Sequence, residues 1–511
     1  MSWNHRGRAL LASVSLSLSL SVSLLLPLAA LPASAEPGLA WRPCPTRYSP
    51  TAQCASVTVP IDRGNPDGGT RFAYRKGAVT LPLVRLPAED PAHRIGSLLT
   101  NPGGPGGSGV DVISYGGQGL ALQTPELAEL RKRFDVIGFD PRGVGHTTPA
   151  ITCDPKKLYD PAVNRFPASR AEYDALVAHN RAAGEDCLAR TGPLLSQVDT
   201  QSAAEDIESI RVALGESRIS WLGVSYGTEL GAAYAAKYPG RLRAMVLDGA
   251  VDHSRPTRRS ILEEAAATED GLLRFVSWCA GSGECAMRGQ DVLAKYDALL
   301  SAHGVPSSQL GRDATPDELA AGFYGYLYVK GFWPLLSQAL AQATSATPDA
   351  SGLTGAAQFF SPSYAAYRAV GCHDSPAPFT GPVDMRVMGE LLKTAAPHSW
   401  RYSEFWDFTS GCTGWPIPAN NPPHARPVRG SVGILVVGNT HDPSTPLVWA
   451  RGLAADIRNS TLLINDGDGH TGLLNSPCVR AEEAKYLVSG IIPAPGTSCA
   501  DSREQAAAPA R

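Results

Sequence analysis

Short apolar runs alternate with amphipathic stretches through much of the chain, and glycine, proline or asparagine residues separate many of them. Compact runs rich in β-branched and other apolar residues predict strands that are buried on both faces of a sheet. The strands predicted in this way are Ile95–Asn101, Phe134–Asp140, Ile219–Val224, Ala244–Asp248, Val432–Val437 and Thr461–Ile464. Two further segments, Val57–Val59 and Arg71–Tyr74, predict an opening hairpin or sheet edge.

Helical periodicity lies between the central strands. In Ser202–Leu214 the apolar positions are spaced by four, three and four residues, and Ser202 with Glu205 can form a capping box. A second helix is predicted over Thr228–Lys237. Strands that alternate with helices predict an α/β fold with a mostly parallel sheet covered by helices on both faces.

The alternation stops after Asp252. The next 177 or so residues are mainly helical and irregular in pattern, are rich in aromatic residues and end in the proline-rich stretch Trp415–Pro427. Because strand signals resume at Val432, we expect one sheet domain in two segments, 36–252 and 430–499. A helical cap, 253–429, would be inserted between them, and 500–511 would form a flexible tail.

The chain begins with a predicted secretory signal peptide. Met1–Arg8 carries two arginines and no acid, Ala9–Leu31 is apolar, and Ala33-Ser34-Ala35 is a small-residue cleavage signal. The apolar run is long enough for a transmembrane anchor, but serines interrupt it and a cleavage signal follows it. We therefore expect cleavage after Ala35 and an extracellular protein that no longer contacts the membrane.

Composition narrows the possible partners. With 45 Lys and Arg against 48 Asp and Glu, and a formal net charge of −3, the chain lacks the basic surplus of a nucleic-acid binder. Phosphate-loop, CxxC and HExxH patterns are missing from the sequence, and we expect no cofactor and no metal. The sequence does not indicate an oligomeric state.

The ten cysteines favour disulfide bonds, because their number is even and an exported protein meets an oxidising environment. Several buried free cysteines are the alternative, and the sequence cannot prove a connectivity. Pairing neighbours along the chain gives Cys44–Cys54, Cys153–Cys187, Cys279–Cys285, Cys372–Cys412 and Cys478–Cys499.

The candidate chemistry begins at Ser225, in the motif Gly223-Val224-Ser225-Tyr226-Gly227. A G-x-S-x-G pattern is weak alone, but here it joins a predicted strand to a predicted helix, which is where a nucleophile elbow lies. A serine in an ordinary strand–helix turn is the alternative. A nucleophilic serine also needs a base and an orienting carboxylate.

Those partners follow late strands of the sheet. Asp442 comes after Val432–Val437 and His470 after Thr461–Ile464, so the chain order is Ser, Asp, His. His441 is a rival base, and Asp466 or Asp468 are rival orienting acids that precede the histidine too closely. Two backbone N–H groups are expected to form an oxyanion hole, those of Tyr226 and of Gly104 in the glycine-rich loop Asn101–Ser108.

Several motifs resemble the secreted tripeptidyl aminopeptidases of actinobacteria, serine exopeptidases of the α/β-hydrolase fold that are related to prolyl iminopeptidases. The motifs are N-P-G-G-P-G-G-S (Asn101–Ser108), F-D-P-R-G-V-G (Phe139–Gly145), G-V-S-Y-G-T (Gly223–Thr228), V-L-D-G (Val246–Gly249), D-P-S-T-P (Asp442–Pro446) and Gly469-His470. The resemblance covers nearly all of the chain after the leader. It implies that Ser225, Asp442 and His470 are the nucleophile, orienting acid and base.

The resemblance also implies that the enzyme releases short peptides, expected to be tripeptides, from a free N-terminus. Such an enzyme needs a carboxylate to receive the ammonium group of its peptide substrate. The candidates in the predicted cap are Glu263, Glu264, Glu269, Asp270 and Asp374. A carboxylesterase or lactonase with the same triad is the alternative enzyme, and a silent binding protein of the same fold is the alternative from another class.

Overall fold

A computed structural model describes residues 39–46, 48–64, 77–115, 117 and 120–500. The predicted signal peptide and the predicted strand Arg71–Tyr74 lie outside these residues, as does 501–511. Ala500, which we expect in the flexible tail, is the last residue of strand β12 (Ser498–Ala500), so the tail prediction is wrong at this residue.

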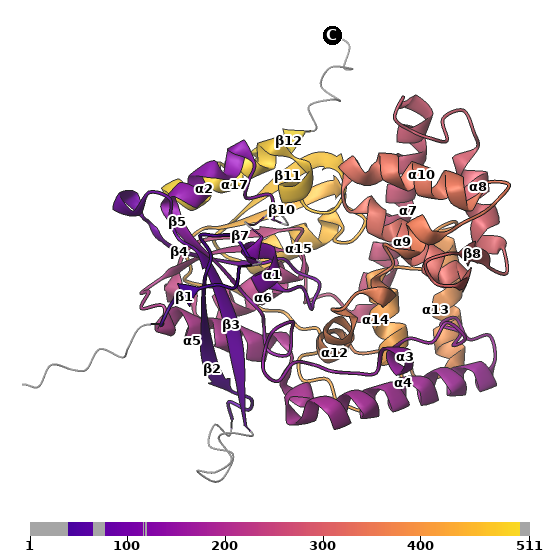
Figure 1. Ribbon diagram of the computed structural model, residues 1–511, viewed down its shortest axis with the longest axis horizontal. Coiled ribbons are helices and arrows are strands. Elements are labelled where there is room, and N and C mark those ends of the chain that lie inside the picture. Colours follow the sequence, from indigo (N-terminus) through magenta and orange to yellow (C-terminus); the bar gives the residue numbers. More distant parts are fainter. Residues whose placement is uncertain (1–38, 47, 65–76, 116, 118–119, 501–511) are drawn as a thin grey trace, which may run out of the picture. The chain divides into compact units, whose positions relative to one another are not determined.

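The described chain contains a ten-stranded sheet with the order β1-β2-β3-β5-β4-β6-β7-β10-β11-β12 (Figure 1). The neighbours from β5 to β12 in this order are parallel, and β1, β2 and β3 add an antiparallel edge. The predicted mostly parallel sheet is confirmed. Its strands are β1 (Arg42–Pro43), β2 (Gln53–Pro60), β3 (Ala78–Leu86), β4 (Gly96–Asn101), β5 (Phe134–Phe139), β6 (Ile219–Val224), β7 (Leu242–Asp248), β10 (Ile434–His441), β11 (Ser460–Asp468) and β12 (Ser498–Ala500).

Helices cover both faces of this sheet. Consecutive side chains of a strand point to opposite faces, so apolar side chains on both faces need helices to cover them. In β10, Ile434 and Val436 pack in a core with α5, α6 and α15, whereas Leu435 and Val437 pack in a second core with α1, α2 and α17. The helices that alternate with the strands are α1 (Gly109–Ser114), α2 (Ala128–Arg133), α5 (Thr200–Ala213), α6 (Tyr226–Lys237), α15 (Leu447–Asp456), α16 (Gly472–Asn475) and α17 (Pro477–Ser489). Short 3-10 helices lie at Pro91–His93, Pro125–Leu127, Gly192–Gln197, Pro239–Arg241, Lys330–Phe332 and Gln358–Phe360.

The predicted start of helix α5 is also wrong. Helix α5 begins at Thr200, and its N-cap is Asp199, whose carboxylate accepts a hydrogen bond from the Ser202 backbone N–H. Ser202 is therefore inside the helix and does not form a capping box with Glu205. Aspartate and serine are both good N-cap residues, so the pattern placed the helix start a few residues late.

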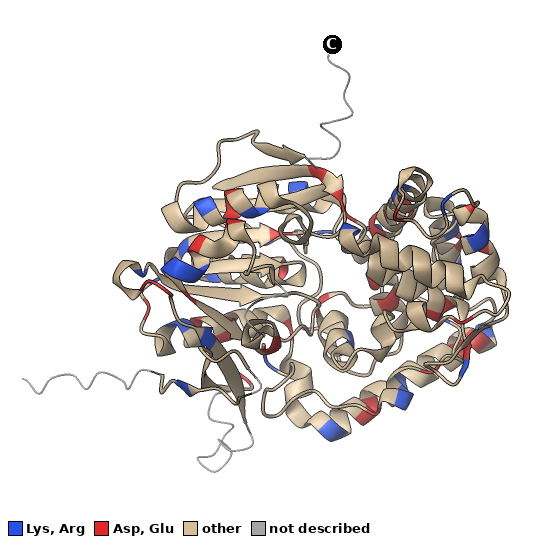
Figure 2. Ribbon diagram, turned by 45° about the horizontal axis from the view of Figure 1, so that its top comes forward, with Lys and Arg blue, Asp and Glu red and all other residues tan. Residues whose placement is uncertain are grey.

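The chain between β7 and β10 is mainly helical. Its elements are α7 (Thr257–Gly281), α8 (Val292–Ser301), the hairpin β8 (Val305–Ser307) with β9 (Arg312–Ala314), α9 (Pro316–Leu327), α10 (Trp333–Ala343), α11 (Ser351–Thr354), α12 (Tyr364–Asp374), α13 (Pro382–Ala395) and α14 (Glu404–Cys412). In Figure 2, Lys and Arg residues are interspersed with Asp and Glu residues over both the sheet region and these helices.

A second inserted segment joins these helices. Between β5 and α5 the chain forms α3 (Pro155–Leu158) and α4 (Arg170–Thr191). Leu176 of α4 packs in one apolar cluster with Ile261, Met388 and Trp406 of the larger insertion. The Asn180 side-chain amide donates to two backbone carbonyls, that of Ser410 in the last turn of α14 and that of Thr413 directly after it. Helix α4 lies in the segment predicted to belong to the sheet domain, but it packs with the cap helices, below α14 in Figure 1.

All five disulfide pairs between chain neighbours form in the structure. Cys153–Cys187 ties α4 to the loop after β5, and Cys372–Cys412 joins α12 to α14. Bridges of this kind limit local opening of the loops and helices that they join. Among the described residues, no helix is both long enough and apolar enough to cross a membrane.

Candidate active site

Ser225 lies in the tight turn between β6 and α6. Its backbone has φ 57° and ψ −126°, a conformation that is strained for a residue with a side chain. The turn needs a small neighbour, because a Cβ on Gly227 would lie 2.6 Å from the backbone oxygen of Asn101 in β4. The strained turn at the end of a strand is the geometry of a nucleophile elbow.

Asp442 follows β10 and is 1% exposed. Its Oδ1 accepts the backbone N–H groups of Ser444 (2.9 Å) and Thr445 (2.8 Å), and its Oδ2 accepts the Thr445 hydroxyl (3.0 Å) and the Thr471 N–H (3.1 Å). Both oxygens lie 3.0 Å from Nδ1 of His470. The carboxylate is thus oriented by its own loop and aimed at the imidazole.

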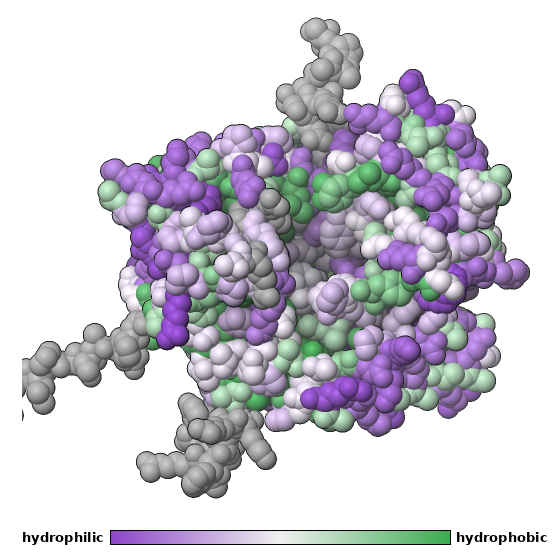
Figure 3. Space-filling view, in the orientation of Figure 1, coloured by the Kyte–Doolittle hydropathy of each residue, from purple (hydrophilic) through white to green (hydrophobic). Residues whose placement is uncertain are grey.

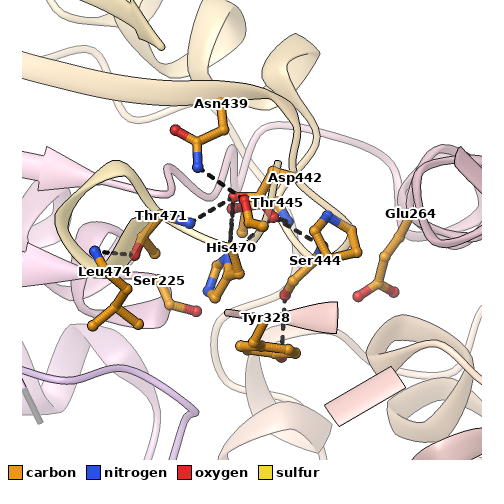
Figure 4. Close-up of polar contacts among 12 residues, drawn as sticks. Ser225, Glu264, Tyr328, Asn439, Asp442, Ser444, Thr445, His470, Thr471 and Leu474 are labelled. Atoms are coloured by element: carbon orange, nitrogen blue, oxygen red, sulfur yellow. Dashed lines mark hydrogen bonds and ion pairs between the residues drawn. The ribbon is translucent and has the colours of Figure 1, made fainter. Parts of the chain in front are cut away.

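His470 follows β11 and is 2% exposed. Figure 4 shows its ring between Asp442 and Ser225. Its Nε2 has no hydrogen-bond partner among the described residues, and His470 and Ser225 line the same cavity. Burial lowers the pKa of His470, but the charge and hydrogen bond of Asp442 and the charges of Glu404 and Asp248 outweigh it, so the pKa is raised.

The glycine-rich loop after β4 packs directly on the elbow. A Cβ on Gly103 would lie 2.7 Å from the Ser225 Cβ, so only glycine allows this approach. Gly104 lines the same cavities as Ser225, and Tyr226 is the first residue of α6. Asp140 of the F-D-P-R-G-V-G motif holds the far end of the loop, because its Oδ1 accepts the Ser108 hydroxyl (2.7 Å). The structure therefore brings both predicted oxyanion-hole residues to the nucleophile.

Two cavities meet at Ser225. One, here called the Glu229 cavity, is lined by Tyr226, Glu229, Val251, Asp374, Glu404, Phe405, Phe408 and Trp449, with Ser225 and Gly104. The other, the Tyr328 cavity, is lined by Tyr324, Tyr328, Gln358, Glu404, His470 and Leu474, again with Ser225 and Gly104. Figure 3 shows a recess in the surface where the sheet region meets the inserted helices. His470 lines the second cavity, and Glu404 lines both.

Glu404 is the first residue of α14 and belongs to a buried pair of carboxyl groups. Burial raises the pKa of Glu404, and burial together with the charge of Glu404 raises the pKa of Glu264 well above its usual range. The Glu264 carboxyl accepts the backbone N–H of Phe405 (2.7 Å), whereas the Glu404 carboxylate accepts the Ser444 hydroxyl (3.0 Å) and borders the cavities. Of the two carboxyl groups, Glu404 borders both cavities, whereas Glu264 lines neither of them.

Two more carboxylates border the Glu229 cavity. Glu229 forms an ion pair with His253 (2.8 Å) and lies near Arg426 (3.5 Å). Burial raises the pKa of Asp374 to about 7, helped by the charge of Glu229. Asp374 accepts the Thr200 hydroxyl (2.6 Å). Three buried carboxyl groups thus surround a cavity whose other walls are largely apolar.

The remaining sequence candidates lie away from these cavities. Glu263 pairs with Arg255 and Arg259 and accepts the Trp449 indole N–H, and Glu269 accepts the Ser399 N–H and hydroxyl. The rival base His441 pairs with Asp270 at 2.7 Å. Of the rival acids, Asp466 accepts the Thr440 hydroxyl, and Asp468 pairs with Arg274 and Lys330.

Glu404 was not predicted from the sequence. It follows the N-cap Ser403 in the first turn of a helix, where acids are common because they stabilise the helix dipole. Nothing in the neighbouring sequence distinguishes such a residue from a solvated one.

In the part of the chain that the structure describes, no group of three or more His, Cys, Asp or Glu residues is placed to hold a metal ion.

The chain is similar to known hydrolases. A family model described as alpha/beta hydrolase fold matches residues 96–304, and one described as TAP-like protein matches 398–499. The serine protease Hip1 of Mycobacterium tuberculosis is 30% identical over 91% of this chain and 92% of its own length. The tripeptidyl aminopeptidase of Streptomyces lividans is 30% identical over 91% of this chain and 87% of its own. The carboxylesterase B of Mycobacterium tuberculosis is 32% identical over 93% and 95%.

Proposed function

Since the chain belongs to the tripeptidyl aminopeptidase family of serine hydrolases with the α/β-hydrolase fold, we propose that it is a secreted peptidase that releases tripeptides from the free N-terminus of its peptide substrates. Ser225 is the nucleophile, His470 the base and Asp442 the orienting acid. The backbone N–H groups of Gly104 and Tyr226 form the oxyanion hole.

The reaction proceeds through an acyl-enzyme. Ser225 Oγ attacks the scissile carbonyl carbon while Nε2 of His470 takes the hydroxyl proton. The N–H groups of Gly104 and Tyr226 stabilise the resulting oxyanion. His470 then gives its proton to the leaving amine nitrogen and the C–N bond breaks. Water, deprotonated by His470, hydrolyses the Ser225 ester and releases the peptide.

The position of His470 orients the substrate. The leaving amine must lie within reach of Nε2, so it occupies the Tyr328 cavity, which His470 lines. The acyl half, which carries the free N-terminus, then occupies the Glu229 cavity. The observation that carries our proposal is that this cavity is bordered by three buried carboxyl groups, Glu229, Asp374 and Glu404.

Buried carboxylates favour a cationic ligand and disfavour a neutral ester. Among the three, we assign the ammonium group to Glu404. Glu229 already has His253 as an ion-pair partner. Asp374 accepts the N–H and hydroxyl of Thr200 and the side-chain amide of Asn421, whereas Glu404 accepts the Ser444 hydroxyl. Glu404 takes the place of the sequence candidates Glu263 and Glu264, which line neither cavity.

Paired substrates test this assignment. A tripeptide p-nitroanilide with a free amine should be cleaved at least about 30-fold more efficiently than its N-acetyl analogue, the rate equivalent of about 2 kcal/mol for a buried charge pair. Glu404→Gln should bring this ratio towards one. Glu263→Gln is the matched control and should leave the ratio unchanged, since Glu263 pairs outside the cavity. Equal cleavage of both substrates by the parent enzyme would refute the aminopeptidase function.

The number of residues released needs its own measurement. Mass spectrometry of a digested peptide mixture should find fragments of three residues, each taken from the N-terminus. Fragments of two or four residues would contradict the tripeptide length while leaving the serine peptidase function intact.

A carboxylesterase is the second candidate, favoured by the similarity to a relative of that name at 32% identity. Such an enzyme would hydrolyse p-nitrophenyl esters and leave both peptide anilides intact. The buried carboxylates of the Glu229 cavity argue for the peptidase.

Export is the last part of our proposal. Five disulfides are consistent with a secreted protein, because such bonds persist in oxidising compartments. N-terminal sequencing of protein collected from the medium should begin at Glu36. A mature N-terminus within the apolar run would overturn the predicted cleavage site.

A further inference from the structure

The loop that carries His470 is bonded to the inserted helices as well as to the sheet. The His470 backbone N–H donates to the carbonyl of Tyr328 at 2.7 Å. The ring of Tyr328 contacts the imidazole edge-on, with ring centroids 4.7 Å apart and planes at 76°. Tyr328 follows α9 directly, so a residue of the insertion supports the candidate base through both its backbone and its side chain.

Asn475, the last residue of α16, connects these two segments. Its Nδ2 donates to the carbonyls of His470 (2.9 Å), Thr471 (3.0 Å) and Tyr328 (3.0 Å). Its Oδ1 accepts the backbone N–H of Lys330 at 3.0 Å. One side-chain amide thus bonds the histidine loop on one side and the segment Tyr328–Lys330 on the other.

The contact is tight and is braced nearby. A Cβ on Gly469 would lie 2.7 Å from the Asn475 amide, so the loop is packed against this side chain. Asp468, two residues before His470, forms ion pairs with Lys330 and Arg274, each at 2.6 Å. Both cations belong to the inserted segment. The loop is therefore attached to the insertion at both ends of the sequence that presents the imidazole.

The backbone position of His470 matters because no hydrogen bond holds its reacting nitrogen. Nδ1 is held by Asp442 and lies 3.2 Å from the Thr445 hydroxyl, but Nε2 has no hydrogen-bond partner among the described residues. A small shift of the loop would pivot the ring about Nδ1 and move Nε2 away from Ser225. A displacement of about 1 Å at a catalytic group can cost on the order of 100-fold in rate.

We propose that Asn475 is a positioning residue that ties the His470 loop to Tyr328–Lys330. The position of His470 Nε2 relative to Ser225 would then depend on this contact with the cap. The proposal rests on the proposed role of His470 as the base. It adds that the cap is part of the support of the triad, besides forming the walls of the substrate cavities.

Asn475→Ala tests the role, with Asn180→Ala as the matched control. The Asn180 side chain also donates a buried amide to two backbone carbonyls, that of Ser410 in α14 at 2.8 Å and that of Thr413 at 2.9 Å, but far along the chain from His470. Both variants lose a side-chain amide that joins the cap to the rest of the chain. We expect similar decreases in thermal stability and a fall in kcat of about 10- to 100-fold for Asn475→Ala alone, with KM unchanged.

The substrate for this comparison is p-nitrophenyl acetate, together with the rate at which a fluorophosphonate labels Ser225. Both report on Ser225 and His470 whatever peptide the enzyme prefers, so the aminopeptidase function can fail while the positioning role stands. If Asn475→Ala does not fold, Asn475→Ser retains one donor and should give an intermediate kcat. Parental kcat and labelling rate in a folded Asn475 variant, or an equal loss of kcat in Asn180→Ala, would overturn the proposal.

Discussion

Replacing Asp442 with Asn removes one negative charge from the candidate triad while keeping the shape of the side chain. The surrounding donors decide how the amide sits. At the Oδ1 position an NH2 group would face the N–H groups of Ser444 and Thr445, neither of which can accept a hydrogen bond. At the Oδ2 position it would face one N–H, from Thr471, and the Thr445 hydroxyl, which can rotate to accept. The NH2 group should therefore take the Oδ2 position.

The catalytic cost follows from the charge that is lost. Asp442 lies 3.0 Å from Nδ1 of His470, and at an effective dielectric constant of about 20 a unit charge at that distance stabilises the imidazolium by about 5.5 kcal/mol. This free energy corresponds to about 10⁴-fold in rate, the size of effect seen when a triad aspartate becomes asparagine. The loss should appear in kcat, because the imidazolium forms only during the reaction.

The assay is kcat and KM for a free-amine tripeptide p-nitroanilide, with Asp466→Asn as the control. Asp466 is an exposed acid close to His470 in sequence that accepts the Thr440 hydroxyl, so its amide should leave kcat unchanged. If Asp442→Asn keeps kcat within tenfold of the parent, or if Asp466→Asn shows the larger loss, the assignment of Asp442 is wrong.

Three further predictions concern the elbow, a buried acid and the cap. A methyl group at Gly227 would lie 2.6 Å from a backbone oxygen of β4, so Gly227→Ala should lower kcat/KM at least about tenfold, whereas Gly240→Ala, which meets open space, should not. Burial raises the pKa of Glu483 well above its usual range, so the folded state keeps a proton that the unfolded chain releases above roughly pH 4.3. The contribution of Glu483 to the free energy of unfolding is full below that pH and falls as pH rises, by up to about 1.4 kcal/mol per pH unit. Glu483→Gln should therefore unfold at a higher urea concentration than the parent at pH 8 but not at pH 4. Equal urea midpoints at pH 8 would contradict this prediction. Removing Cys372–Cys412, which spans 40 residues, should destabilise the protein by about 4 kcal/mol on the chain-entropy model, and an unchanged melting temperature would exclude that contribution.

The central strands were predictable because a strand buried on both faces is an uninterrupted apolar run. Ile219–Val224 has the predicted bounds, and the strands on either side of it differ from the predicted ones by a few residues at most. The packing of α4 was not predictable. Its charged and apolar residues show little helical segregation, and its buried positions are defined by Met388 and Trp406, more than 200 residues away in the chain.

The sequence by itself determined the central strands of the sheet, and it singled out Ser225, Asp442 and His470 as candidates. Each of these signals is local: an apolar run, a motif at the end of a strand, an order along the chain. Tertiary structure alone decided that Glu404 borders the cavities while Glu264 lies behind it, and that Asn475 joins the histidine loop to the cap. The reason is physical. The role of a carboxylate or an amide depends on its burial and on partners from segments that are distant in the sequence. The neighbouring residues in the sequence indicate neither of these.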